Sequence, residues 1–105
     1  MGKLVFAIYK PNEGEEKALL EIISRHTNVL LSQDLISRRK VIVLKANKGQ
    51  IIEIFEWKSE NAIGYAHENE KVLEIWSEFA KVCSYETLHD LSELDMIFPD
   101  FEVIA

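Results

Sequence analysis

The chain has 105 residues, of which 48% are hydrophobic and 29% charged, and its formal net charge at pH 7 is -6. This size and composition are typical of one globular domain with one core, and they exclude a disordered chain. The negative charge would repel phosphate backbones, and the only basic cluster, residues 38–40, is too small to predict a nucleic-acid interface.

The single cysteine and the N-terminal segment bear on where the protein works. Cys83 has no second cysteine with which to form an internal disulfide, which suits a reducing compartment. The apolar run at residues 4–9 is too short for a signal-peptide core or a membrane span. We therefore expect a cytoplasmic protein that makes no membrane contact and folds without cofactor or metal.

The first half of the chain predicts a strand followed by a helix. Residues 3–9, KLVFAIY, lack polar alternation, as in a strand that is buried on both faces. Asn12 with Glu15 three positions later has the signature of a helix N-terminus, so we expect a helix from there to about Gln33. His26 lies on the apolar stripe of this helix.

The second half predicts a hairpin, a second helix and a last strand. Two β-rich runs within residues 40–57 flank ANKG, where Gly49 can take the positive φ that a short loop needs. Ser59 can cap a helix from Asn61 to about Val82. The expected apolar stripe of that helix consists of Ala62, Ala66, Leu73, Trp76, Ala80 and Cys83. Residues 84–100 are expected to form a loop with a short helical turn, and 101–105 a short strand.

The order β-α-β-β-α-β predicts an α+β fold, the ferredoxin-like sandwich, with both helices on one face of the sheet. The other face is apolar as well, because Leu4, Phe6 and Ile8 alternate with Val5, Ala7 and Tyr9 along the first strand. An apolar face left in water favours association. We therefore expect a homodimer built sheet against sheet.

Four short segments stand out: Glu-Trp-Lys-Ser at the end of a strand (residues 56–59), Ala-His on the next helix, a later Trp, and the closing MIFPDFEVI. Together with the element order, they resemble the antibiotic biosynthesis monooxygenase-like family of the dimeric α/β-barrel superfamily. The resemblance covers nearly the whole chain and implies a single domain, residues 1–105, whose homodimer closes a barrel. Some members are cofactor-free oxygenases of polycyclic phenols, and others open the heme ring.

The heme-degrading members of this family use an Asn on the first strand, a Trp at the end of the third strand and a His iron ligand on the second helix. Trp57 matches that Trp, but Ala7 stands in place of the Asn and Trp76 in place of the His. A heme site without its axial ligand lacks its main anchor, so we do not expect heme degradation.

Three polar residues form the predicted catalytic group. If Trp57 faces the helices, as the resemblance implies, then Phe55 and Glu53 share that face. A buried carboxylate needs a donor, and His26 and His67, one on each helix, are the natural candidates. Such a cluster could hold a general base that removes a phenolic or carbon-bound proton. A structural hydrogen-bond cluster and a Glu-His-His metal site are the alternatives.

The expected substrate-binding residues are aromatic side chains that could stack on a flat ligand or simply form core. They are Tyr9, Phe55, Trp57, Tyr65 and Trp76. Arg38 and Arg39 could guide an anion or lie solvated at the start of a strand. The leading hypothesis is a cofactor-independent monooxygenase-like enzyme for a small hydrophobic or aromatic molecule. The alternative is a homodimer, ligand-binding or structural, without turnover.

Overall fold

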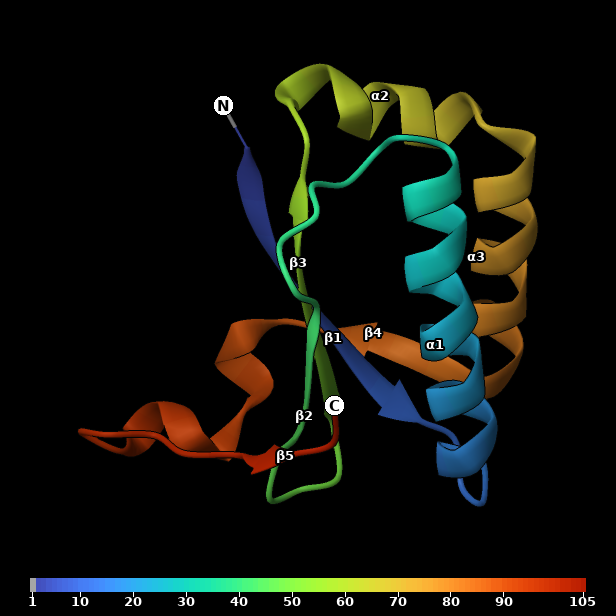
Figure 1. The fold of residues 1–105 in the computed structure, drawn as a ribbon. Helices are drawn as coiled ribbons and strands as arrows, with labels where there is room; N and C mark the ends of the chain where they lie inside the picture. The colour runs from blue at the N-terminus through green and yellow to red at the C-terminus, as the bar shows by residue number, and fades with distance from the viewer. Residues whose placement is uncertain (1) are drawn as a thin grey trace.

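One antiparallel sheet carries helices on one of its faces in the computed structural model, which describes residues 2–105 (Figure 1). The strands are β1 (Lys3–Pro11), β2 (Ile42–Lys45), β3 (Ile51–Trp57), β4 (Cys83–Glu86) and β5 (Glu102–Val103). Their order in the sheet is β4-β1-β3-β2-β5. The helices are α1 (Glu16–Ser32), α2 (Glu60–Glu68) and α3 (Glu70–Val82). The predicted α+β class is confirmed.

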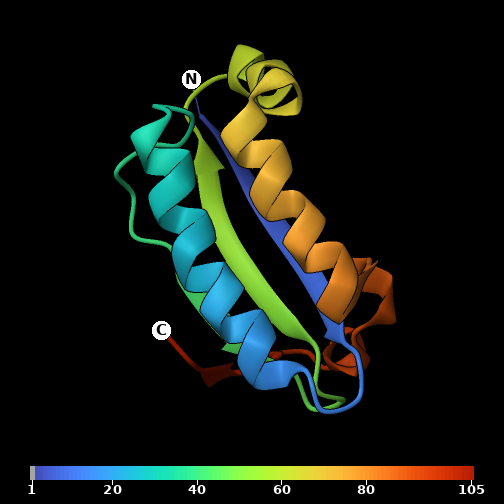
Figure 2. The same cartoon turned by 90° about the vertical axis from the view of Figure 1, so that its right-hand side faces the viewer.

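The pairing of β1 with β3 decides which side chains face the helices. Ala7 lies opposite Glu53, and Val5 opposite Phe55. Residues directly opposite one another in an antiparallel pair share a face, so these four side chains and Tyr9 lie on the helix side, as predicted for Glu53 and Phe55. Figure 2 shows α1 and α3 side by side along this face of β1 and β3.

The first helix begins later than predicted. Asn12 does not cap it: the Asn12 side chain donates to the Lys81 carbonyl oxygen at 3.4 Å, and the helix starts at Glu16. Gly14 has a φ of 78°, which is outside the helical region, so no helix can run through it. The end at Ser32 agrees with the prediction.

The predicted single helix over residues 61–82 is wrong, because the chain breaks at Asn69. Asn69 has an extended backbone, and its side chain accepts hydrogen bonds from the amides of Lys71 and Val72, which caps α3. Ser59 does cap α2, as predicted. The break also shifts the apolar stripe, because a helix that restarts takes a new rotation about its axis. The residues that α3 buries are Val72, Ile75 and Phe79, while Leu73 and Ala80 are exposed.

Residues 83–86 form a strand, where the end of the helix at Cys83 and a loop from residue 84 were expected. β4 pairs with the outer side of β1, with Tyr9 opposite Tyr85. The predicted last strand is present as β5, at the other edge of the sheet beside β2. Between them, two 3-10 turns, Leu88–Asp90 and Ser92–Asp95, belong to a segment that extends away from the body (Figure 1).

The face of the sheet opposite the helices is only partly covered. Leu91 packs there against Ile8, Ala46 and Ile52, and the buried Glu93 accepts a hydrogen bond from the backbone amide of Asn47 at 2.6 Å. The uncovered part leaves Leu4, Phe6 and Ile42 exposed. Within residues 2–105, no helix has the length and apolar character that crossing a membrane requires.

Candidate active site

Glu53 lies in the centre of the sheet with none of its surface exposed. Period-two alternation along β3 directs its side chain toward the helices. The carboxylate accepts a hydrogen bond from the Tyr9 hydroxyl at 2.6 Å, and its two oxygens lie 3.1 and 3.0 Å from Nδ1 of His26. The predicted contact between Glu53 and a helical histidine is therefore confirmed for His26.

His26 comes from the apolar stripe of α1 and is 3% exposed. The indole Nε1 of Trp76 donates to Nε2 of His26 at 3.1 Å. An indole nitrogen is a donor only, so Nε2 must be the acceptor and the proton of the neutral ring sits on Nδ1. Nδ1 then donates to Glu53. The result is a connected network, with Trp76 donating to His26 and both His26 and Tyr9 donating to Glu53.

The environment keeps the Tyr9 hydroxyl protonated. Burial raises the pKa of Tyr9 far above its ordinary value, and the neighbouring Glu53 carboxylate raises it further. Tyr9 is therefore a hydrogen-bond donor at every physiological pH and not a base. Its ring stacks on Phe79 with centroids 4.8 Å apart, which holds the hydroxyl in place.

A cavity of about 320 Å³ lies against this network, within the size range of small-molecule sites. Its walls are formed by Ala7, Tyr9, His26, Phe55, Trp76 and Tyr85. Most of these side chains are aromatic, so the cavity suits a flat, apolar molecule. Glu53 lies behind Tyr9 and His26, and any proton that it helps to move must pass through one of them.

His67 was predicted to join Glu53 and His26, and the structure places it elsewhere. It is exposed on α2, with its ring centroid 5.0 Å from that of Trp76. The cause is the break at Asn69, which leaves α2 across the end of the sheet while α3 runs along it (Figure 1). Tyr9, expected only as a substrate contact, makes the second hydrogen bond to Glu53 instead.

The aromatic residues predicted to bind substrate divide into two groups. Tyr9, Phe55 and Trp76 line the cavity. Trp57 does not: it is buried in the core cluster beneath α2 and packs edge-on against Phe55. Tyr65 is 62% exposed on α2 and is not part of the cavity wall. The catalytic roles of His26, Glu53 and His67 remain predictions.

Tyr85 is a wall residue that the sequence reasoning missed. It reaches the cavity because β4 pairs with β1. CSYE is too short for a pattern of period two to distinguish it from loop, so no local signal identified this strand.

A cluster of metal ligands and a reactive thiol are two further kinds of site that could supply chemistry near the cavity. Among residues 2–105, no group of three or more His, Cys, Asp or Glu side chains is placed to hold a metal ion. Cys83 is buried, its thiol donates to the Phe79 carbonyl oxygen at 3.2 Å, and burial raises its pKa to about 11. A thiol with so high a pKa packs in the core and does not act as a nucleophile, as predicted.

Comparisons with protein-family models, with curated proteins and with solved structures found no match to this chain. The fold and the site together therefore describe an α+β protein with a buried Tyr-Glu-His-Trp network beside an aromatic cavity.

Proposed function

We propose that this protein is a cofactor-independent monooxygenase-like enzyme that acts on a small hydrophobic, aromatic molecule in the cavity between sheet and helices. The observation that carries the proposal is the pairing of His26 with the buried Glu53 at the wall of that cavity. A carboxylate behind an imidazole orients the ring and stabilises the imidazolium that forms when the ring accepts a proton.

Nε2 of His26 would accept the substrate proton. In the structure this ring nitrogen accepts a hydrogen bond from the Trp76 indole. Trp76 is only partly buried, so a phenolic hydroxyl can take the place of its indole N–H. Deprotonation makes the substrate an electron-rich anion that can reduce dioxygen. For a methylene beside a phenolic ring the reaction balances as CH₂ plus O₂ giving C=O plus H₂O. One oxygen atom enters the product and the other leaves as water.

The proposal includes the ferredoxin-like arrangement and the family resemblance predicted from the sequence. The order β4-β1-β3-β2, with helices on one face, supports the ferredoxin-like arrangement.

The proposal also includes a homodimer through the outer sheet faces. Leu4, Phe6 and Ile42 are exposed there, and Ile97 and Phe98 on the protruding segment are 89% and 86% exposed. Exposed apolar surface of this kind is typical of an interface.

The second candidate is a homodimer without turnover, which either binds a small ligand or has only a structural role. The observation that favours it is that both nitrogens of His26 and the hydroxyl of Tyr9 already have hydrogen-bond partners. A fully satisfied buried network is what a purely structural cluster would also show.

Oxygen uptake in the presence of a hydroxylated anthrone would separate the two candidates. The wild-type protein is expected to consume one O₂ for each quinone formed, and His26→Gln to lower this rate about 100-fold, the scale of general-base catalysis. His89→Gln changes an exposed histidine outside the site and is the matched control. Quenching of Trp76 fluorescence without oxygen uptake would favour ligand binding alone. An anthrone that neither reacts nor binds would contradict the enzyme proposal.

A further inference from the structure

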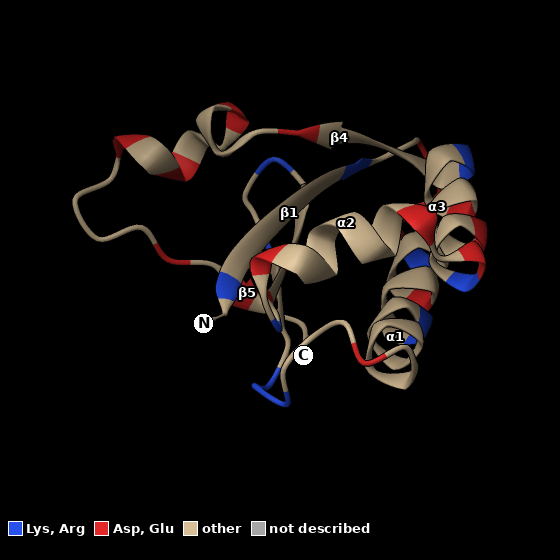
Figure 3. Ribbon diagram, turned by 90° about the horizontal axis from the view of Figure 1, so that it is seen from above, with Lys and Arg blue, Asp and Glu red and all other residues tan. Residues whose placement is uncertain are grey.

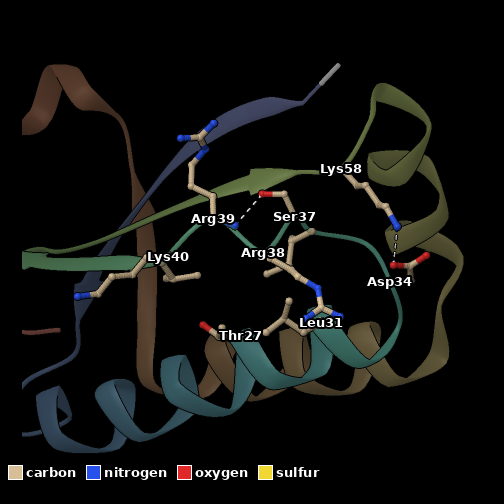
Figure 4. Close-up of a pocket in the computed structure, with 10 residues that line it drawn as sticks. Thr27, Leu31, Asp34, Ser37, Arg38, Arg39, Lys40 and Lys58 are labelled. Carbon is tan, nitrogen blue, oxygen red and sulfur yellow. Dashed lines mark hydrogen bonds and ion pairs between the residues drawn. The ribbon is translucent and has the colours of Figure 1, made fainter.

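A second cavity, of about 670 Å³, lies between α1 and the loop that leads into β2 (Figure 4). It is lined by Thr27, Leu31, Asp34, Ile36, Ser37, Arg38, Arg39, Lys40, Val41 and Lys58. It shares no lining residue with the aromatic cavity. The inference drawn from it therefore goes beyond the function proposed above.

Basic side chains gather at this cavity although the chain as a whole is acidic, and the loop at residues 38–40 carries three of them in a row (Figure 3). Lys58 forms an ion pair with Asp34, with 2.6 Å between Nζ and Oδ1, and Arg39 forms one with Glu56, with 3.2 Å between Nε and Oε1. Arg38 makes no ion pair or side-chain hydrogen bond with any residue in the range 2–105.

The two arginines of the loop point in different directions. In Figure 4 the guanidinium group of Arg38 reaches from the loop to α1 and lies beside Leu31, whereas the Arg39 side chain points away from the helix. Arg38 is exposed and presents an unpartnered fork of N–H donors at the wall of the cavity, the geometry that binds the two oxygens of a carboxylate or phosphate.

The cavity floor next to Arg38 is apolar. Leu31 is 43% exposed there, and Ile36 and Val41 complete the wall. An adjoining cavity of about 200 Å³ shares Thr27 and Val41 with it and continues along α1. The other residues that line the adjoining cavity are Leu20, Ile23, Ser24, Val43, Ile104 and Ala105. A charged end and an apolar channel therefore form one continuous groove.

We propose that this groove binds an amphipathic anion, with an oxyanion head on Arg38 and an unbranched apolar tail along α1 past Thr27 and Val41. The head is a carboxylate or a phosphate ester, because either offers Arg38 two charged oxygens in one plane. The tail supplies the remaining affinity by covering the exposed Leu31 and filling the adjoining cavity.

Calorimetric titration of the full chain with octanoate, octyl phosphate and octanol tests the head group. Binding of octanoate or octyl phosphate, but not of octanol, is expected, and the tighter of the two anions identifies the head. Arg38→Gln should weaken binding about tenfold, the scale of one charge-assisted hydrogen bond. Lys81→Gln, which removes one positive charge from an exposed site on α3, should leave it unchanged.

The proposed position of the tail is tested by the length of the ligand's alkyl chain and by the residues whose resonances shift. Shortening octanoate to butyrate should weaken binding about fourfold for each methylene removed, and Thr27→Phe, which blocks the channel, should abolish this dependence. Amide resonances of residues 38–41 should shift on titration while the Trp76 indole resonance stays in place. Octanol binding as tightly as octanoate, an unchanged affinity in Arg38→Gln, or shifts confined to Trp76 would each overturn the proposal.

Discussion

At the scale of single residues, Glu53 shows how a charged group is accommodated in the core. The carboxylate has no access to water, and it accepts hydrogen bonds from Tyr9 and His26. Burying an ionised group costs several kcal/mol unless donors replace the lost water. The two donors come from a neighbouring strand and from the facing helix, so the carboxylate ties these elements together whether or not it takes part in chemistry.

Tyr9→Phe should reduce the free energy of unfolding by about 1–3 kcal/mol, because it removes one of the two donors and leaves Glu53 partly unsatisfied. Urea unfolding followed by circular dichroism measures this. Tyr85→Phe is the matched control, since its hydroxyl makes no hydrogen bond within residues 2–105, and should cost under about 0.5 kcal/mol. Equal losses in the two variants would show that the hydroxyl of Tyr9 is not needed by Glu53.

Alkaline pH should destabilise the protein in part through Cys83. Burial raises the pKa of this thiol from 9.0 to about 11, so the unfolded chain loses the proton first as pH rises. The contribution of Cys83 is therefore complete below pH 9 and is lost as pH rises from 9 to 11. Urea unfolding at pH 8 and 10.5 should show a smaller pH-dependent loss for Cys83→Ala than for the wild type. An identical loss would contradict the assignment.

At the scale of elements, the break between α2 and α3 determines which residues reach the site. With one continuous helix, the apolar stripe would have included Leu73 and Ala80. Because α3 restarts at Glu70 with its own cap, Ile75 and Phe79 face the core in place of Leu73 and Ala80. Trp76 lies between Ile75 and Phe79 on this helix and donates to Nε2 of His26.

Asn69→Ala should lower the free energy of unfolding by about 1 kcal/mol, because it removes the oxygen that accepts from the amides of Lys71 and Val72. Asn69→Asp keeps this acceptor and suits the N-terminus of a helix, so it should cost less. Urea unfolding of both variants gives the comparison. If the two substitutions cost the same, the side chain matters through its bond to Gln33 and not as a cap.

At the scale of the whole molecule, the two sides of the sheet differ. Helices α1 and α3 pack along one side, whereas the other side is covered only in part, by Leu91 packed against Ile8, Ala46 and Ile52 and by Glu93 bonded to the Asn47 amide. Exposed apolar side chains on this open face and on the protruding segment would form a large patch on a monomer. A second copy of the chain would cover both.

Light scattering after size exclusion should therefore give twice the mass of the 12.1 kDa chain at micromolar concentration. Phe6→Glu on the open face and Ile97→Glu on the protruding segment should each shift the protein toward monomer, because a buried unpaired carboxylate opposes association. Leu73→Glu, an equally drastic change on the outer side of α3, should not. Wild-type protein that elutes as a monomer would contradict the proposed homodimer.

Local pattern was sufficient for much of the fold and for part of the site. Period-two alternation placed Glu53 and Phe55 on the same face as Trp57, which the family resemblance implied to be the helix side, and the spacing of three and four placed His26 on the inner stripe of α1. The hairpin around Gly49 and the cap at Ser59 likewise depend on residues close together in the chain. These features are set by neighbours within a few positions, which is the range over which a pattern carries information.

Only the tertiary structure decided the rest of the site. Tyr9 and Glu53 are 44 residues apart, and Trp76 and His26 are 50 apart, so no local spacing links them. The position of His67 depended on whether the chain breaks at Asn69, and that of Tyr85 on a short strand formed by pairing with β1. Hydrogen-bond partners of a buried group are chosen by which side chains packing brings within reach, and that choice depends on every element of the core at once.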